Sequence, residues 1–366
     1  MMKNLLVILL GVTGSFAYAG ITGTPADYME GFVTGTPEIK SVNALAFGPQ
    51  GILFIGDSKS ASVYAIETAD KAASVDNIEM KDVDKQLASA LGTTAENIMI
   101  QDLVVHPLSK KVYVAVHHAN GTPALLMLEG DRFVPVNLSN IRYSSAAIKN
   151  AVGEDAKDGR GRPLRVWTIS DLGYYDGKVM VSGLSSQEFS STFRSIPFPF
   201  KDNEQAASLE IYHASHGQYE TNSPIKTFMA TELDGEPYLV ASYTCTPLVI
   251  FPMNQLRQGE HVKGRTVAEL GNRNTPLDMV SMKKDGRSYL LLANSSRALM
   301  RINYDDIASF KESLSSPVEN TGGVKFVALP YVNVLQMDKL DEERFVLLQR
   351  KADGNLDLMT VESRRL

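Results

Sequence analysis

A short apolar strand, a polar turn and a second apolar strand recur as one unit along most of the chain. Apolar runs bounded by Gly, Asp and Asn are typical of paired β-strands. The unit occurs six times, at 43–47 with 52–55, 102–105 with 112–116, 171–174 with 179–181, 227–230 with 238–241, 278–280 with 289–292, and 336–337 with 345–348. From Leu45 to Met337 the repeat averages about 58 residues, longer than the ~40–50 of familiar propeller repeats, which leaves room for large loops.

A third strand follows each pair, at 62–66, 124–128, 191–196, 247–251, 298–302 and 356–361. A fourth follows in five units, at 77–80, 133–138, 209–212, 266–270 and 324–329. The sixth unit lacks a fourth strand, whereas residues 31–34 precede the first unit without a partner. Pairing them would close a ring and remove its exposed edges. The sequence therefore predicts an all-β fold, a six-bladed β-propeller with N-to-C-terminal strand closure of the last blade.

Two other architectures fit the pattern less well. A seven-bladed ring needs a seventh strand pair, and a two-sheet sandwich rarely repeats at a fixed period. Residues 81–91 predict a short helix between the first two blades, and 144–162 a long polar insertion between the second and third. Neither is a second domain, so residues 20–366 are expected to form a single propeller domain.

The N-terminus has the pattern of a secretory signal peptide. Lys3 precedes an apolar run, and small residues, including Ala17 and Ala19, stand where a signal peptidase cleaves. The run is much shorter than the ~20 residues of a membrane span. We expect residues 1–19 to be removed and the protein to be secreted or periplasmic.

Composition narrows the function classes. One cysteine in 366 residues excludes an intrachain disulfide, so a large core must hold the fold. The formal charge of −6 becomes −7 when Lys3 is removed with the signal peptide, and a negative charge argues against nucleic-acid binding. No membrane-spanning segment is expected. The sequence contains no serine-hydrolase elbow, phosphate-binding glycine loop or haem-attachment motif. No cofactor is certain; Ca²⁺ or a transition metal is the open candidate.

The first unit also resembles a known group of propellers. Its sequence LAFGPQGILFIGDS at 45–58, followed by Val63-Tyr64-Ala65-Ile66, is similar to the blades of NHL-type and SMP-30/strictosidine-synthase-like proteins. The resemblance implies a six-bladed fold. It covers families of calcium-dependent lactonases, lyases and non-enzymatic binding proteins, so it implies no single reaction. The N-terminal glutamate motif of the SMP-30 lactonases is not evident here.

Propeller topology assigns many polar side chains to one face. Loops from second to third strands, and from one blade to the next, emerge together, and ligands are expected there or in the channel mouth. The predicted ligand-face residues are Asp57, Ser58, His117, His118, Arg160, Arg162, His213, His216, Tyr219, Glu220, Tyr243, Thr244, Cys245, Asn272, Arg273, Asn294, Arg297, Tyr331 and Asn333. Four of the six histidines are among them.

The most metal-like cluster is His213 and His216 followed by Glu220, because imidazole and carboxylate are ligands of zinc, copper and iron. A third ligand from elsewhere is needed, and His117 or His118 could supply it. Alternatively, these histidines cap strand ends and hydrogen-bond to loop backbone.

A second candidate site is the channel lining. Asp102, Asp171 and Asp278 stand just before the first apolar residue of their inner strands, with Gln336 in the same register and Asn43 one place displaced. Oxygen atoms converging on an axis could bind Ca²⁺. Alternatively, each aspartate accepts hydrogen bonds from backbone amides and holds adjacent blades together.

Cysteine and arginine side chains on the same face leave further alternatives. Cys245 could be a nucleophile or a soft metal ligand, although such a cysteine is more often a small buried hydrophobic residue. The arginines at 160, 162, 273 and 297 could bind a carboxylate or phosphate, or could be solvated loop charges.

Taken together, these patterns predict an exported propeller that binds a small polar ligand, a metal ion or a partner protein on its His- and Arg-rich face. The alternative is a metal-dependent hydrolase or lactonase that uses the channel carboxylates. In that enzyme the cation would polarise a carbonyl and activate water, with His213 or His216 as the base.

Overall fold

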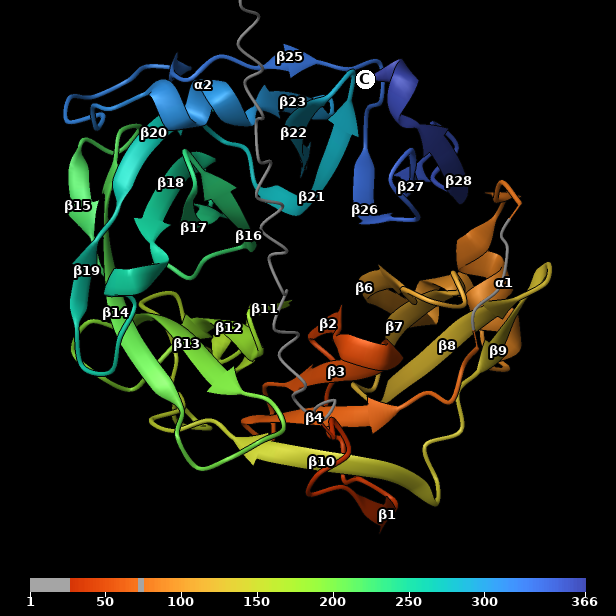
Figure 1. Ribbon diagram of the computed structural model, residues 1–366. Helices are drawn as coiled ribbons and strands as arrows, with labels where there is room; N and C mark the ends of the chain where they lie inside the picture. The colour runs from red at the N-terminus through yellow and green to blue at the C-terminus, as the bar shows by residue number, and fades with distance from the viewer. Residues whose placement is uncertain (1–26, 72–75) are drawn as a thin grey trace, which may run out of the picture.

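Six sheets, antiparallel except for one short parallel pair in the third, stand around a central axis in the computed structural model, which describes residues 27–71 and 76–366 (Figure 1). We number the blades by the order of their inner strands along the chain. Each blade begins at the axis and ends at the outside of the ring (Figure 1). The six-bladed β-propeller expected from the repeat is therefore confirmed.

The strands of the six blades, from the axis outward, have the following bounds. Blade 1 contains β2 (Ala44–Phe47), β3 (Ile52–Asp57), β4 (Ser62–Glu67), β10 (Ile141–Ala147) and β1 (Val33–Gly35); blade 2 contains β6 (Ile98–Val105), β7 (Val112–His118), β8 (Pro123–Glu129) and β9 (Arg132–Pro135). Blade 3 contains β11 (Asp171–Tyr175), β12 (Lys178–Leu184), β13 (Ser191–Pro197) and β14 (Gln205–His213), with β15 (Gln218–Glu220) and β19 (His261–Lys263) both paired to β14. Blade 4 contains β16 (Thr227–Leu233), β17 (Glu236–Ser242), β18 (Pro247–Pro252), β20 (Arg265–Glu269) and β24 (Gly322–Gly323). Blade 5 contains β21 (Pro276–Lys284), β22 (Arg287–Asn294), β23 (Met300–Asn303) and β25 (Val327–Ala328), and blade 6 contains β26 (Val334–Lys339), β27 (Arg344–Arg350), β28 (Leu356–Glu362) and β5 (Glu79–Met80).

Helices are few and short. The helix expected at 81–91 is α1 (Val83–Ala90), and α2 (Tyr304–Ser309) follows β23. Single 3-10 turns occur at Pro49–Gly51, Ala95–Asn97, Arg165–Trp167, Met253–Gln255 and Ser363–Arg365. Among the residues at 27–71 and 76–366, no helix is long and apolar enough to cross a membrane. The expected signal peptide, residues 1–19, lies outside the described residues.

The blades do not follow one another around the ring in chain order. The inner strands touch in the order β2, β6, β26, β21, β16, β11 and back to β2, so blade 2 lies between blades 1 and 6 (Figure 1). The chain therefore builds blade 1, then blade 2 on one side of it, and then passes blade 1 again to reach blade 3 on the other side. Strand β10, on the outside of β4, is laid down on that return.

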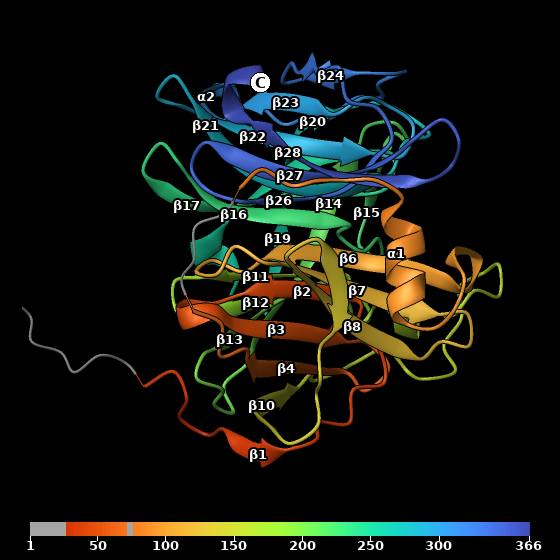
Figure 2. The same cartoon turned by 90° about the vertical axis from the view of Figure 1, so that its right-hand side faces the viewer.

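The last blade is closed by an N-terminal segment, but not by the strand that the sequence suggested. Its outer strand is β5, which pairs Met80 with Leu358 and Glu79 with Met359. The segment 31–34 instead leads into β1, which pairs with β10 at the rim of blade 1 (Figure 2). Likewise, the strand expected at 77–80 belongs to blade 6, and blade 1 takes residues 141–147 as its fourth strand. The predicted insertion at 144–162 thus begins as a strand.

Apolar contacts explain this choice of closing strand. Ile78 and Met80 pack with Leu356 and Leu358 of β28 in a cluster that includes Leu87 of α1. Backbone hydrogen bonding continues at Ile78, whose carbonyl accepts from Thr360 N at 2.8 Å. By contrast, Val33 in β1 is largely exposed.

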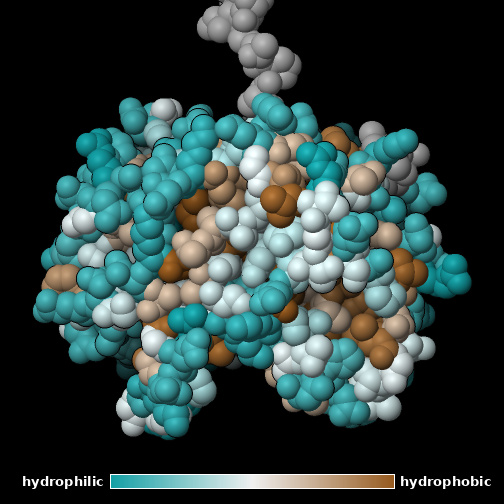
Figure 3. Space-filling model, turned by 90° about the horizontal axis from the view of Figure 1, so that it is seen from below, coloured by the Kyte–Doolittle hydropathy of each residue, from teal (hydrophilic) through white to brown (hydrophobic). Residues whose placement is uncertain are grey.

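Seen from the blade 1 side, the surface is mainly hydrophilic with separate hydrophobic patches (Figure 3).

Candidate metal centre

His213 and His216 are brought together by a tight hairpin at the outer edge of blade 3. His213 is the last residue of β14, and β15 turns back so that His213 pairs with Gln218. The amides of His216 and Gly217 both donate to the carbonyl of His213, at 3.1 and 2.8 Å. Gly217 has a φ of +66°, and a Cβ there would lie 3.1 Å from Pro317, so the turn requires glycine. The centres of the two imidazole rings are 3.8 Å apart.

Glu220 holds both rings from one side. Its carboxylate oxygens lie 3.0 Å from His213 Nδ1 and 2.6 Å from His216 Nδ1. Burial alone would raise the pKa of Glu220, but the hydrogen bonds from His213 and His216 outweigh it and lower this pKa to about 2. The carboxylate is therefore ionised at neutral pH and accepts a hydrogen bond from each Nδ1–H, which in the neutral tautomer of the imidazole leaves the lone pair on Nε2.

The free nitrogen of His213 is buried. The side chain is 2% exposed, and within the described part of the chain its Nε2 has no hydrogen-bond partner. A buried, unpaired polar atom costs ~1–3 kcal/mol, so its presence in a native fold calls for an explanation. His216 is more open, with 43% of its side chain exposed. One buried and one accessible imidazole thus share a carboxylate.

Cys245 of blade 4 completes the cluster. A ring nitrogen of each histidine and the Cys245 sulfur all lie within 4.8 Å of one another, which makes this trio the grouping among the described residues that could hold a metal ion. Ligand atoms around a tetrahedral or trigonal metal ion are about 3.3–3.8 Å apart, so small side-chain rotations would bring the three donors to bonding distance. We call His213, His216 and Cys245 the metal trio.

The backbone at Cys245 is strained. Cys245 and Thr246 have φ values of +65° and +57°, a conformation that costs ~1–3 kcal/mol for a residue other than glycine. Neighbouring loops hold this turn, since Cys245 N donates to the Asn274 carbonyl at 2.7 Å and Thr246 Oγ1 donates to the Gly271 carbonyl at 2.9 Å. Strain kept in place by such contacts is typical of functional positions.

The two histidines of the metal trio line an open depression of about 400 Å³, together with Gln218, Tyr219 and Thr244 among others. Tyr219 is exposed and stands edge-on to Tyr212, with ring centres 5.1 Å apart. Three protein donors and access from solvent leave a coordination position for an exogenous ligand, as in metal sites that react or exchange.

The channel carboxylates have a different arrangement. Asp102, Asp171, Asp278 and Asp338 each accept one hydrogen bond from the next residue's amide and one from the inner strand of a neighbouring blade. The inter-blade donors are the amides of Leu45, Phe228, Met337 and Val105 respectively, at 2.6, 2.9, 2.5 and 2.6 Å. With its amide nitrogen turned toward the carboxylates, Gln336 donates to both Asp102 and Asp278 at 3.1 Å. These four aspartates therefore link blades 2 to 1, 3 to 4, 5 to 6 and 6 to 2.

The electrostatics of the channel agree with this linking role. Burial raises the pKa of Asp171 to about 7 and that of Asp338 to about 6. Burial and then the charge of Asp171 raise the pKa of Asp102 well above its usual range, and burial and then Asp102 do the same for Asp278. A channel of about 450 Å³ contains these carboxylates. Asn43, expected among them, instead accepts from Ser41 Oγ and Ser58 N with its side-chain oxygen.

The other residues predicted for the ligand face are spread over the ring. His117 and His118 end β7 in blade 2, and His117 Nε2 accepts from Val42 N at 2.9 Å, so neither serves as the third ligand of the trio. Tyr243 and Asn294 are buried. Arg162 pairs with Asp158, Arg297 donates to Asn320, and Tyr331 packs in the core of blades 5 and 6. Besides the two histidines, Tyr219, Glu220 and Thr244 line the same depression, whereas Arg160, Asn272, Arg273 and Asn333 are exposed loop residues.

Comparison with known proteins assigns this chain to no family. No family model and no curated protein matches the chain. Solved structures give weak likenesses: a putative oxidoreductase (glucose dehydrogenase) from Thermus thermophilus (12% identity, TM-score 0.31, 90% of this chain and 100% of that one) and a GH43 endo-arabinanase from Bacillus licheniformis (13%, 0.36, 73% and 94%). The WD40 β-propeller domain of Doa1 is a third (7% identity, TM-score 0.32, 92% and 98%). The propeller fold rests on the six sheets of this chain rather than on these likenesses.

Proposed function

We propose that this chain is an exported, copper-binding β-propeller whose ion is held by His213, His216 and Cys245. The observation that carries the proposal is the shared carboxylate of Glu220, which accepts from both Nδ1 atoms and leaves His213 Nε2 buried without a partner among the described residues, in a cluster where a ring nitrogen of each histidine lies within 4.8 Å of the Cys245 sulfur. A carboxylate behind a ligating histidine is the usual second layer of a metal site. Export is supported by the signal-like sequence of residues 1–19.

Copper is favoured over other ions by the donor set. A thiolate and two imidazoles suit soft or borderline metals rather than Ca²⁺ or Mg²⁺. Two histidines and one cysteine in a trigonal arrangement are typical of copper, and Cu²⁺ also exceeds Zn²⁺ in intrinsic affinity for N and S ligands. A structural zinc site would normally have a fourth protein ligand.

Protection of the single thiol tests this proposal. Titration of the reduced protein with one equivalent of copper should block alkylation of Cys245, and a chelator should restore it. A thiol that reacts equally fast with and without copper would overturn the proposal. Zinc serves as the comparison ion, with weaker protection expected.

Substitution of Glu220 tests the carboxylate that orients the ligands. We expect Glu220→Gln to weaken copper binding by about 10–100-fold, because an amide holds the two Nδ1–H groups less firmly. The matched control is Glu210→Gln, since Glu210 makes the same kind of contact to His261, at 3.0 Å, on the exposed edge of blade 3. Equal affinities of the two variants, measured by chelator competition, would argue against this role of Glu220.

Kinship to NHL- and SMP-30-like propellers stays part of this proposal, supported by the blade sequence at 45–58. A calcium-dependent hydrolase centred on the channel is the weaker alternative. Each channel aspartate already uses both oxygens for backbone amides, which favours linking of blades over catalysis.

A further inference from the structure

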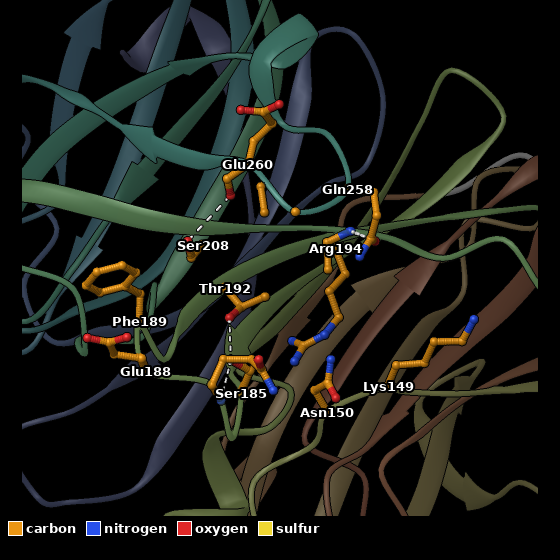
Figure 4. Close-up of a pocket in the computed structure, with 14 residues that line it drawn as sticks. Lys149, Asn150, Ser185, Glu188, Phe189, Thr192, Arg194, Ser208, Gln258 and Glu260 are labelled. Carbon is orange, nitrogen blue, oxygen red and sulfur yellow. Dashed lines mark hydrogen bonds between the residues drawn. The ribbon is translucent and has the colours of Figure 1, made fainter.

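A second pocket, of about 260 Å³, lies on the flank of blade 3, away from the metal trio. Strands β13 and β14 form its floor, and residues 149–150 and 258–260 form two of its walls. Its lining includes Asn150, Ser185, Thr192 and Arg194 (Figure 4). None of its residues takes part in the metal trio or the channel.

Arg194 is a buried cation with most of its donors unused. The side chain is 1% exposed, and its one hydrogen bond of acceptable geometry runs from Nη2 to the Leu184 carbonyl at 3.3 Å. Among the residues described, Nη1 and Nε have no hydrogen-bond partner. A guanidinium carries five N–H donors, and a buried charge left so poorly paired costs several kcal/mol. Figure 4 shows the guanidinium directed toward Ser185, Thr192 and Asn150 in the pocket.

Glu204 balances only one side of this cation. Its Oε1 is 3.3 Å from Arg194 Nε without hydrogen-bond geometry, and its Oε2 accepts from Lys149 N at 3.0 Å. Glu204 does not line the pocket, whereas Arg194 does. The Nη1 edge is therefore the part of the guanidinium that remains available to a ligand.

The outer lining carries two carboxylates and one amine, and the amine of Lys149 is paired outside the pocket with Asp202 at 2.6 Å. Glu188 and Glu260 are exposed, and in the described ranges neither forms an ion pair. Phe189 lies beside them, 38% exposed, with its ring centre 4.3 Å from that of His261. The pocket thus combines a buried cation, two outer carboxylates that are unpaired among the described residues, a lysine that is paired outside the pocket, and one apolar surface.

We propose that this pocket binds a small zwitterion of the size of a free α-amino acid. The ligand carboxylate would accept hydrogen bonds from Arg194 Nη1 and from the hydroxyl and amide groups around it. The ligand ammonium would face Glu188 and Glu260. Hydrogen bonds between charged groups contribute ~1.5–3 kcal/mol, against ~1 kcal/mol for neutral ones, which favours a carboxylate over a sugar hydroxyl. The two outer carboxylates disfavour a simple anion.

Calorimetry with matched small molecules tests the inference. L-alanine and L-leucine should bind the full-length protein, whereas L-alanine methyl ester, which lacks the carboxylate, and propionate, which lacks the ammonium, should each bind at least about tenfold more weakly. Failure of every free amino acid to bind at millimolar concentration would overturn the proposal, and so would equal binding of the ester.

Variants locate the binding. Arg194→Met combined with Glu204→Gln removes the buried pair without leaving a lone charge, and binding should be lost. If this variant does not fold, two substitutions at the pocket surface, Asn150→Ala and Glu188→Gln, test the site instead. Each should weaken amino-acid binding several-fold. Unchanged affinity in both variants would refute the site. Cys245→Ser should bind as the wild type does, which separates this site from the metal trio.

Discussion

Replacing Cys245 with serine is expected to weaken copper binding by at least about 100-fold, more than the loss of an outer-shell partner. Serine is close in size to cysteine, so the turn at 243–247 should keep its form. However, a hydroxyl stays protonated at neutral pH and is a poor ligand for a soft ion. The expected readouts are a lower affinity in chelator competition and disappearance of the intense thiolate-to-copper absorption band.

Two comparisons sharpen this experiment. Thr244→Ser changes the exposed neighbour in the same turn and should leave copper affinity unchanged. Cys245→Gly should lose the metal while remaining at least as stable as the wild-type apoprotein in urea, because glycine adopts a φ of +65° without strain. Copper binding that survives in Cys245→Ser would show that the thiol is not a ligand.

Removal of a channel aspartate is expected to cause the largest loss of stability. Asp102→Ala leaves the amides of Leu45 and Leu103 without their acceptor, at bonds of 2.6 and 2.7 Å, and should cost about 3 kcal/mol of unfolding free energy in metal-free protein. Asp131→Ala, in an exposed turn, is the matched control and should change stability by less than about 0.5 kcal/mol. Equal effects of the two substitutions in urea unfolding would contradict the linking role.

The pH dependence separates linking carboxylates from a cation site. Burial raises the pKa of folded Asp171 to about 7, above its value in the unfolded chain. Its contribution to stability is therefore fully present below about pH 4 and is lost as the pH rises to about 7. Asp171→Asn should remove that decline. A bound Ca²⁺ would reverse the slope, because it would keep the carboxylates ionised.

Much of the fold could be predicted because each blade repeats the same apolar pattern, and buried strands must carry that pattern. The pairing of outer strands could not. Strand β5 is two residues long, and β10 comes from a segment that looked like a loop, so the sequence holds little information on which sheet edge each one joins. The position of blade 2 between blades 1 and 6 has no local signal either.

The candidate metal site could likewise be predicted only in part, because only some of its residues are close in sequence. The spacing of His213, His216 and Glu220 is local, so the sequence indicated their grouping. Cys245 comes from the next blade, and its approach depends on the turn held by Gly271 and Asn274. Asp338 was missed although it lies two residues after Gln336, at the spacing that places strand side chains on one face. Nothing in the sequence marked Arg194, whose burial is a tertiary property.

Copper content per chain is the most direct test of the metal centre. Reduced wild-type protein, loaded with excess copper and freed of unbound metal by gel filtration, should retain one copper ion per chain by elemental analysis. The triple variant His213→Ala, His216→Ala, Cys245→Ser should retain none. Wild-type protein that keeps no copper, or a triple variant that keeps as much as the wild type, would contradict a copper site at these three residues.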